Sequence, residues 1–401
     1  MPKVGVWIIG VHGSVAAASI AGAKIIARGL VTPTGLITEL PELLDVEFLP
    51  FDQMVFGGHD VGKRTVRESF TNLSNEAHID YKFAEGISDE LDTVEGDVRR
   101  GITLGCGKVI SEVADMPLDL DSIPLVDATK KLVDDIIAFK KKHNLRSIVV
   151  VNLSSTEPPP LIGTHTETLD GFEKALQSDR KDLLCASMLY AYAAFKSGCP
   201  FINFTPSAGA SIPALIELAK KQQVPYVGND GKTGETLIKS VLALLFKYRA
   251  MKVLSWQGYN ILGNMDGKVL DEPATKLSKK ITKDSVLSQI LGYGPHTHVG
   301  IDYVPSLGEW KIAWDFIHFE GFLGTRMNLQ FTWNGCDSIL AAPLVLDLVR
   351  LVELAHRRGE KGILPHLALF FKHQLGTDVS DLAGQWDLLL DYLKKAKEER
   401  I

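Results

Sequence analysis

A turn of acidic, basic and glycine residues offers the clearest chemistry in this sequence. It spans residues 227–240, follows an apolar run and enters a helix at Thr233. A helix N-terminus presents unpaired N–H groups and a positive dipole end, so the turn can receive a phosphate. Asp230 ends the apolar run, and Lys232 and Lys239 lie on the turn and in the helix. These residues indicate an enzyme that binds a small phosphorylated molecule.

A second glycine turn lies near the N-terminus, between an apolar run and a helix of small residues. Gly10 and Gly13 are spaced as in turns that hold a dinucleotide pyrophosphate, but His12 occupies the place of the central glycine of GxGxxG. A tight turn without a ligand has the same features. The ribose-binding acid should end the second strand, and Glu39 and Asp60 are both candidates for it.

Hydroxyl-bearing residues follow another strand, at 152–156 (NLSST). Ligands of open α/β sheets bind at such strand ends, so these hydroxyls could contact ribose or nicotinamide. They could equally cap the next segment. The predicted cofactor site also includes the turn residues His12, Ser14 and Val15, together with Ser154, Thr156, Thr205 and Asp230.

Lysines form the third group, because a desolvated lysine can stabilise an oxyanion or accept a proton. Lys279 and Lys283 are four residues apart and would share a helix face, which is either part of a site or a solvated basic surface. Lys372 follows the apolar run 367–371, and a buried lysine normally has a partner or a function. It could also extend to solvent from a helix end. Asp337 precedes an apolar helix and could cap it, pair with a lysine, or do both.

The elements that must position these residues alternate between strand and helix as far as about residue 230, which predicts a doubly wound α/β sheet. Strands are expected at 3–9, 35–38, 54–56, 147–153, 200–204 and 224–228, and helices at 122–142, 166–178, 182–197 and 211–222. Residues 61–105 are expected to form a long loop that could act as a flap.

The pattern changes after about residue 250 to consecutive strands, at 253–262, 298–304, 312–322 and 327–333. Loose alternation in the last one favours an antiparallel sheet with one face covered. Helices are expected at 338–357, 364–372 and 381–399. We therefore expect a Rossmann-type domain, residues 1–229 and 336–401, interrupted by an α+β domain at 230–335.

Composition excludes several classes of protein. The chain has 401 residues, 45% of them hydrophobic, and a net charge of −6, which argues against a general nucleic-acid coat. No apolar run approaches the roughly 18 residues of a membrane span. Four scattered cysteines without a CxxC pair, and an N-terminus that enters a strand directly, predict a cytoplasmic protein. GxSxG and HExxH are absent, which argues against serine and zinc hydrolases.

Four ordered stretches together resemble the myo-inositol-1-phosphate synthase family, most closely its short prokaryotic and archaeal forms. They are VGNDGKTGETLIKSVLA (227–243), YNILGNMDGKVL (259–270), SKKITK (278–283) and CDSILAAPLVLDL (336–348). The resemblance implies a homotetrameric isomerase that converts glucose 6-phosphate to 1L-myo-inositol 1-phosphate. In that family, bound NAD oxidises the sugar, cyclisation follows, and the hydride is returned. The inserted domain carries catalysis and tetramerisation.

The resemblance also implies roles for particular residues. Lys279, Lys283, Lys311 and Lys372 match the family's active-site lysines, and Asp230 and Asp337 match its site carboxylates. Positions that hold the phosphate match Thr233, Gly234, Glu235, Leu262 and Asn264. Asp266 matches a position near nicotinamide, and Asp60 an acid on the cofactor ribose. A cation near the NAD phosphates, held by Asp230 or Asp266, is left open.

Two stretches depart from the long forms of the family. The glycine-asparagine-rich nucleotide loop is here Gly10-Val-His-Gly13, and an Asn-Gly-Ser-Pro-Gln stretch is here 203–207 (NFTPS). Glu235 replaces a glutamine, which would put a negative charge beside a phosphate. An NAD(P)-linked dehydrogenase of a phosphorylated sugar, and a non-enzymatic NAD sensor, are the alternatives to the synthase.

Overall fold

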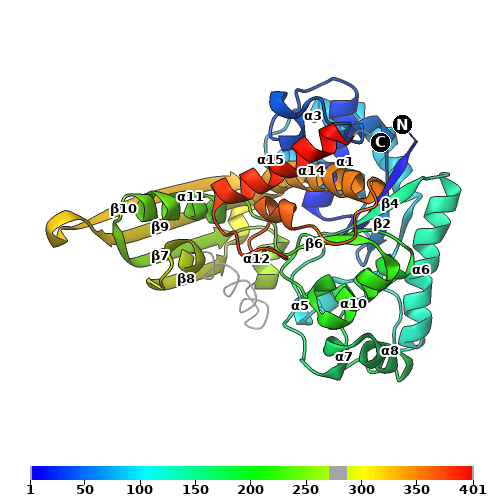
Figure 1. The fold of residues 1–401 in the computed structure, drawn as a ribbon. Coiled ribbons are helices and arrows are strands. Elements are labelled where there is room, and N and C mark those ends of the chain that lie inside the picture. The colour runs from blue at the N-terminus through cyan, green and yellow to red at the C-terminus, as the bar shows by residue number, and fades with distance from the viewer. Residues whose placement is uncertain (1, 271–286, 400–401) are drawn as a thin grey trace.

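The computed structural model of the chain describes residues 2–270 and 287–399, and its strands form two sheets (Figure 1). The first sheet is parallel throughout, in the order β11-β6-β5-β4-β1-β2-β3. Its strands are β1 Val4–Ile9, β2 Met54–Asp60, β3 Val98–Arg100, β4 Ser147–Asn152, β5 Phe201–Asn203, β6 Pro225–Gly228 and β11 Gly362–Ile363. This order, with β1 beside both β2 and β4, is that of Rossmann folds and confirms the expected fold class.

Helices cover both faces of the parallel sheet, which explains why its strands read as continuous apolar runs. In β1, Val4, Val6 and Ile8 pack on one face, and Trp7 and Ile9 pack on the other. The first face is covered by α1 Ser14–Ala27, α14 Asp337–Arg357 and α15 Leu382–Glu398. The second is covered by α6 Leu125–Lys142, α8 Leu169–Gln177, α9 Ala186–Lys196 and α10 Pro213–Gln222.

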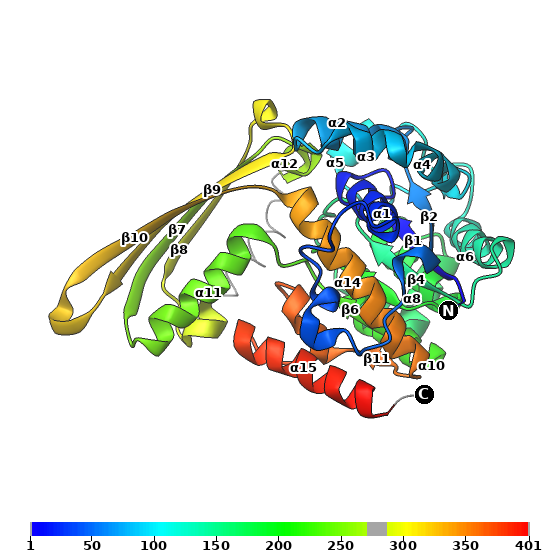
Figure 2. The same cartoon turned by 90° about the horizontal axis from the view of Figure 1, so that it is seen from above.

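The second sheet has the order β10-β9-β7-β8 and is mixed, because β8 pairs with β7 in parallel. Its strands are β7 Lys252–Leu262, β8 His296–Tyr303, β9 Trp310–Glu320 and β10 Arg326–Cys336. The expectation of a purely antiparallel sheet was therefore wrong for β8. Helix α11 Gly234–Tyr248 covers one face, where Phe246 packs on Trp256 and Phe319. Figure 2 shows this sheet extending away from the parallel one, with α11 alongside it.

Residues 61–105 are not a loop, contrary to expectation. They contain α2 Val66–Glu76, α3 Tyr81–Gly86 and α4 Ser88–Glu95, followed by β3. The strand expected at 35–38 is also absent, and a 3₁₀ turn, Ile37–Glu39, lies there instead. The backbone N–H groups of Ile37 and Thr38 donate to the Asp347 carboxylate of α14 rather than to a neighbouring strand.

Short helices also occur in the described chain. They include α5 Lys108–Val113, α7 Thr164–Glu167, α12 Met265–Leu270 and the 3₁₀ helix Pro365–Phe370, which replaces the α-helix expected at 364–372. Among the helices in the described part of the chain, none combines the length and the apolar character that crossing a bilayer would require.

Candidate active site

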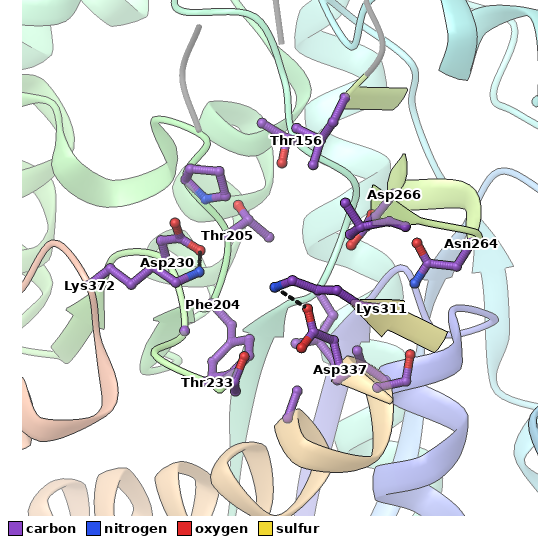
Figure 3. Close-up of a pocket in the computed structure, with 18 of the residues that line it drawn as sticks. Thr156, Phe204, Thr205, Asp230, Thr233, Asn264, Asp266, Lys311, Asp337 and Lys372 are labelled. Atoms are coloured by element: carbon purple, nitrogen blue, oxygen red, sulfur yellow. Dashed lines mark hydrogen bonds and ion pairs between the residues drawn. The ribbon is translucent and has the colours of Figure 1, made fainter. Parts of the chain in front are cut away.

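A cleft lies where the carboxyl ends of the parallel strands meet the second sheet, and it brings together most of the predicted site residues (Figure 3). Its inner part is lined by Val15, Ser154, Thr156, Thr205, Asp230, Thr233, Leu262, Asn264, Asp266, Lys311, Asp337 and Lys372. Its outer part is lined by Gly10, His12, Gly13, Ser14 and Asp60. Lys279 and Lys283 lie outside the residues that the structure describes.

The N-terminal glycine turn forms one wall of the outer part. Gly10 has a φ of +83°, and a Cβ there would lie 3.1 Å from the Leu153 carbonyl oxygen, so the turn requires glycine. Just beyond it, α1 begins at Ser14 and points its N-terminus at the cleft. Ile102, Ile110 and Tyr190 add an apolar pocket to the same wall. A close backbone approach, a helix N-terminus and an apolar pocket together suit a dinucleotide.

Asp60 ends β2 beside this turn, at the position of a ribose-binding acid. Its carboxylate accepts the backbone N–H groups of His12 at 2.8 Å and of Gly62 at 2.9 Å. Burial alone would lower the pKa of His12, but the neighbouring Glu95 and Asp60 carboxylates outweigh burial and raise it. The alternative acid, Glu39, forms an ion pair with Arg350 and does not line the cleft, so that interpretation was wrong.

Two lysine–aspartate pairs face each other across the inner cleft. Lys372 Nζ lies 3.0 Å from Asp230 Oδ1, and Lys311 Nζ lies 3.0 Å from Asp337 Oδ2, as the dashed lines in Figure 3 mark. Burial disfavours the charged form of Lys311, but Asp337, then Glu235 and Asp230, raise its pKa above the ordinary value. Lys311 therefore enters the cleft as an ammonium group, which suits it to stabilise negative charge on a substrate oxygen.

Asp230 adopts a left-handed backbone conformation, with a φ of +59°. Two backbone hydrogen bonds hold it there: its N–H donates to the Thr205 carbonyl at 3.0 Å, and its own carbonyl accepts the Lys372 N–H at 2.7 Å. Such conformations in residues other than glycine cost free energy and concentrate at functional sites. The same bonds fix the relative positions of the Lys372 and Asp230 side chains.

Helix α11 begins at the cleft, with Thr233 as its N-cap residue. Gly234 has a φ of +53°, and a Cβ there would lie 3.2 Å from Asp337 Oδ1, so glycine lets the turn approach that carboxylate. The backbone N–H groups of this first turn have no partner within the helix and can bind an anion.

The two lysines of this turn do not face the cleft, contrary to expectation. Lys232 Nζ donates to Gln385 Oε1 of α15 at 2.6 Å, and Lys239 pairs with the buried Glu235. Neither lysine lines the cleft, nor does Glu235. Among the described residues, the lysines that line the inner cleft are instead Lys311, which lies on β9, and Lys372, which lies just after the 3₁₀ helix Pro365–Phe370.

Two further features of the site were not predicted. Side-chain amides link the ends of three parallel strands, since Asn152 donates to Asn203 at 3.1 Å and Asn203 donates to Asn229 at 2.8 Å. Glu309 accepts hydrogen bonds from Ser14 at 2.7 Å and Ser338 at 3.0 Å, at the starts of α1 and α14. Both features join residues far apart in the sequence, and only the position of each asparagine at a strand end could have pointed to the first.

A metal site was left open by the sequence. Within residues 2–270 and 287–399, no three or more His, Cys, Asp and Glu side chains are grouped as a metal would require. Asp230 is paired with Lys372, as described above. A cation held by Asp230 or Asp266 therefore remains a hypothesis.

Comparison with known proteins agrees with this geometry. Residues 4–394 match the family model described as myo-inositol-1-phosphate synthase. An inositol-3-phosphate synthase of Bacteroides thetaiotaomicron is 32% identical over 99% of this chain and 96% of its own length. A rice enzyme of the same name is 38% identical, over 58% of this chain and 47% of its own.

Solved structures of similar proteins share the fold of this chain. A myo-inositol-1-phosphate synthase-related protein of Thermotoga maritima superposes with a TM-score of 0.78 and 25% identity, covering 98% of both chains. The inositol-3-phosphate synthase of Caenorhabditis elegans superposes with a TM-score of 0.88 over 99% of this chain and 86% of its own, and at 23% identity it shows the shared fold. With a family match that runs almost from end to end, the chain belongs to the myo-inositol-1-phosphate synthase family.

Proposed function

We propose that this protein converts D-glucose 6-phosphate to 1L-myo-inositol 1-phosphate by internal oxidation, enolisation, aldol cyclisation and re-reduction. The protein is an isomerase, and NAD is its cofactor. The observation that supports the residue-level proposal most directly is the pair of Lys–Asp ion pairs, Lys311–Asp337 and Lys372–Asp230. They line one cleft together with the N-cap of α11.

The outer cleft would hold the cofactor. Gly10, Gly13 and the N-terminus of α1 would bind the pyrophosphate, and Asp60 would bind a ribose. His12, Val15, Ser154, Thr156, Thr205 and Asp266 would complete its contacts. When bound, NAD would supply hydride transfer, as acceptor before ring closure and as donor after it, so it would not be consumed.

The inner cleft would hold the sugar phosphate, with the phosphate at Thr233 and Gly234 and further contacts from Leu262 and Asn264. Lys311 and Lys372 would face the sugar oxygens, where oxidation, enolate formation and ring closure each develop negative charge. Asp337 and Asp230 would hold these two lysines in place. Lys279 and Lys283 remain predicted catalytic residues, from the resemblance alone.

The cleft supports an isomerase over a simple dehydrogenase, because oxidation of one alcohol needs one acid–base group and here two buried lysines face the same space. The test is to incubate the purified protein with glucose 6-phosphate and NAD, following products by phosphorus NMR and NADH by absorbance. Inositol phosphate should accumulate without net NADH. A steady rise in NADH with no cyclised product would establish the dehydrogenase instead, and tight NAD binding without turnover would establish a sensor.

We also propose that the chain is organised as the sequence predicts, with a nucleotide domain, residues 1–229 and 336–401, and a catalytic and oligomerisation domain at 230–335. The second sheet leaves one face without a covering helix in the described chain, and Tyr259 and Trp314 on it are 46% and 43% exposed. Such a face suits association between copies of the chain, in line with a homotetramer. The four cysteines are buried and form no disulfide, which fits the proposed cytoplasmic location.

A further inference from the structure

Three charged side chains are buried beneath the first turn of α11, and none of them lines the cleft. Glu235, Lys239 and Asp315 are 0%, 2% and 0% exposed. Lys239 Nζ lies 2.5 Å from Glu235 Oε1 and 3.3 Å from Asp315 Oδ1. The Trp256 indole N–H donates to Asp315 Oδ1 at 2.6 Å. We call Glu235, Lys239 and Asp315 the buried triad.

Burying three charges is costly unless they compensate one another. Burial would lower the pKa of Lys239, but Glu235 and Asp315 raise it, so the ammonium is retained. Burial raises the pKa of Asp315; Lys239 opposes this, and Glu235 adds to it. Three apolar side chains could fill the same space without these opposing effects, so the triad calls for a role beyond stability.

A glycine in β7 leaves room for the triad. A Cβ at Gly258 would lie 2.9 Å from Lys239 Nζ, 3.1 Å from Asp315 Oδ1 and 3.1 Å from Glu235 Oε1. A single methyl group at Gly258 would therefore press on all three charged ends. It offers a way to disturb the triad without altering any of its members.

The triad connects the phosphate-binding turn to the second sheet. Glu235 is the second residue of α11, next to Gly234, and Asp315 lies four residues beyond Lys311 on β9. Because side chains alternate along a strand, Asp315 and Lys311 point to the same face of the sheet. We propose that Glu235, Lys239 and Asp315 form a positioning unit that fixes the first turn of α11, and with it Thr233 and Gly234, relative to Lys311.

This inference rests on the proposed function, because it takes the first turn of α11 as the phosphate site. It also gives Glu235 a different role from the phosphate contact that the family resemblance implies. The Glu235 carboxylate does not line the cleft and is paired with Lys239, so the phosphate would not contact it. A Glu at the start of a helix with Lys four residues later is also the favourable order for the helix dipole.

The test compares four variants: Glu235→Gln, Lys239→Met, the double variant, and Gly258→Ala. The first, second and fourth should each raise KM for glucose 6-phosphate about 10-fold with kcat changed less than about 3-fold, since they displace a binding turn and leave the reacting groups in place. In the double variant, the fold-increase in KM should be well below the product of the fold-increases in the two single variants, because the two residues act as one unit. Lys247→Met, on the exposed side of the same helix, is the matched control and should have no effect.

A second measurement does not depend on turnover. Hydrogen–deuterium exchange of the amides at 233–237 should be faster in Glu235→Gln and Gly258→Ala than in the wild type, with exchange in α1 unchanged. Three results would overturn the positioning role. They are a KM in Glu235→Gln below that of the wild type, a fold-increase in the KM of the double variant equal to the product of the two single fold-increases, and hydrogen exchange at 233–237 unchanged from the wild type. If the wild type made no inositol phosphate, the proposed function would fail, and the exchange data would still decide whether the triad holds the turn.

Discussion

The Lys372–Asp230 pair allows stability and catalysis to be separated. Both side chains are almost fully buried, 8% and 3% exposed, with Nζ and Oδ1 3.0 Å apart. Lys372→Met keeps the length of the side chain but removes the ammonium group that lies beside the buried Asp230 carboxylate. Breaking a buried pair in this way costs about 3–5 kcal/mol. Because both groups are shielded from water, no reduction of that figure for solvent screening is needed.

The expected loss of stability can be expressed as a melting temperature. At about 2.1 cal/mol/K of unfolding entropy per residue, a chain of 401 residues should lose about 4–6 °C in Tm. If Lys372 also faces the sugar, kcat should fall about 100-fold or more, as for other acid–base groups. The double variant Asp230→Asn/Lys372→Met should regain most of the Tm, because both charges of the pair are removed together, and none of the kcat.

Calorimetry and a product assay at saturating NAD measure the two quantities on the same preparations. Recovery of turnover in the double variant would show that Lys372 acts only by neutralising Asp230. A single variant that kept more than about a tenth of kcat would refute direct contact between Lys372 and the sugar.

Three further expectations follow from other regions. Asp60→Asn should raise the Kd for NAD about 10-fold or more in a fluorescence titration, because a charged acceptor at the nucleotide turn is worth about 1.5–3 kcal/mol; an unchanged Kd would remove Asp60 from the cofactor site. Trp314→Glu should reduce the mass measured by light scattering to that of a dimer or monomer, and an intact tetramer would exclude the open sheet face as an interface. Burial raises the pKa of Asp347 to about 6, so its stabilising contribution is full below the unfolded pKa, about 3.9, and is lost as pH rises through 6. The Tm of wild type relative to Asp347→Asn should therefore increase as pH falls from 7 to 4, and a constant difference would contradict the raised pKa.

The sequence predicted the parts of the fold that local patterns determine. Apolar runs at 3–9 and 147–153 became β1 and β4 because strands covered on both faces need apolar residues throughout. Two interpretations of Lys372 were open, a buried lysine with a partner or a lysine that extends to solvent, and the structure agrees with the first, because Lys372 is buried and pairs with Asp230. The start of α2 also has a sequence signal, because Thr65 and Glu68 have the spacing of a capping box and form one in the structure. The segment was nevertheless interpreted as a loop.

Other features depend on contacts that no local pattern reports. Ile37 and Thr38 give their N–H groups to Asp347, which is 309 residues from Thr38, so a strand-like segment became a 3₁₀ turn. Lys232 and Lys239 were placed on the correct turn and helix, but their directions are set by Gln385 of α15 and by Glu235. Glu309 has no distinguishing neighbour in the sequence, and only the fold brings it to Ser14 and Ser338.

The core beneath the first sheet has a consequence for how the protein is made. The apolar residues of β1 and α1 pack in one cluster with those of α14, the 3₁₀ helix Pro365–Phe370 and α15. A nascent chain therefore exposes that side of its earliest strands until the ribosome has added residues 337–398. During translation the apolar residues of β1 and α1 would stay uncovered until the C-terminal helices are made. A chaperone would therefore have the longest time to bind there.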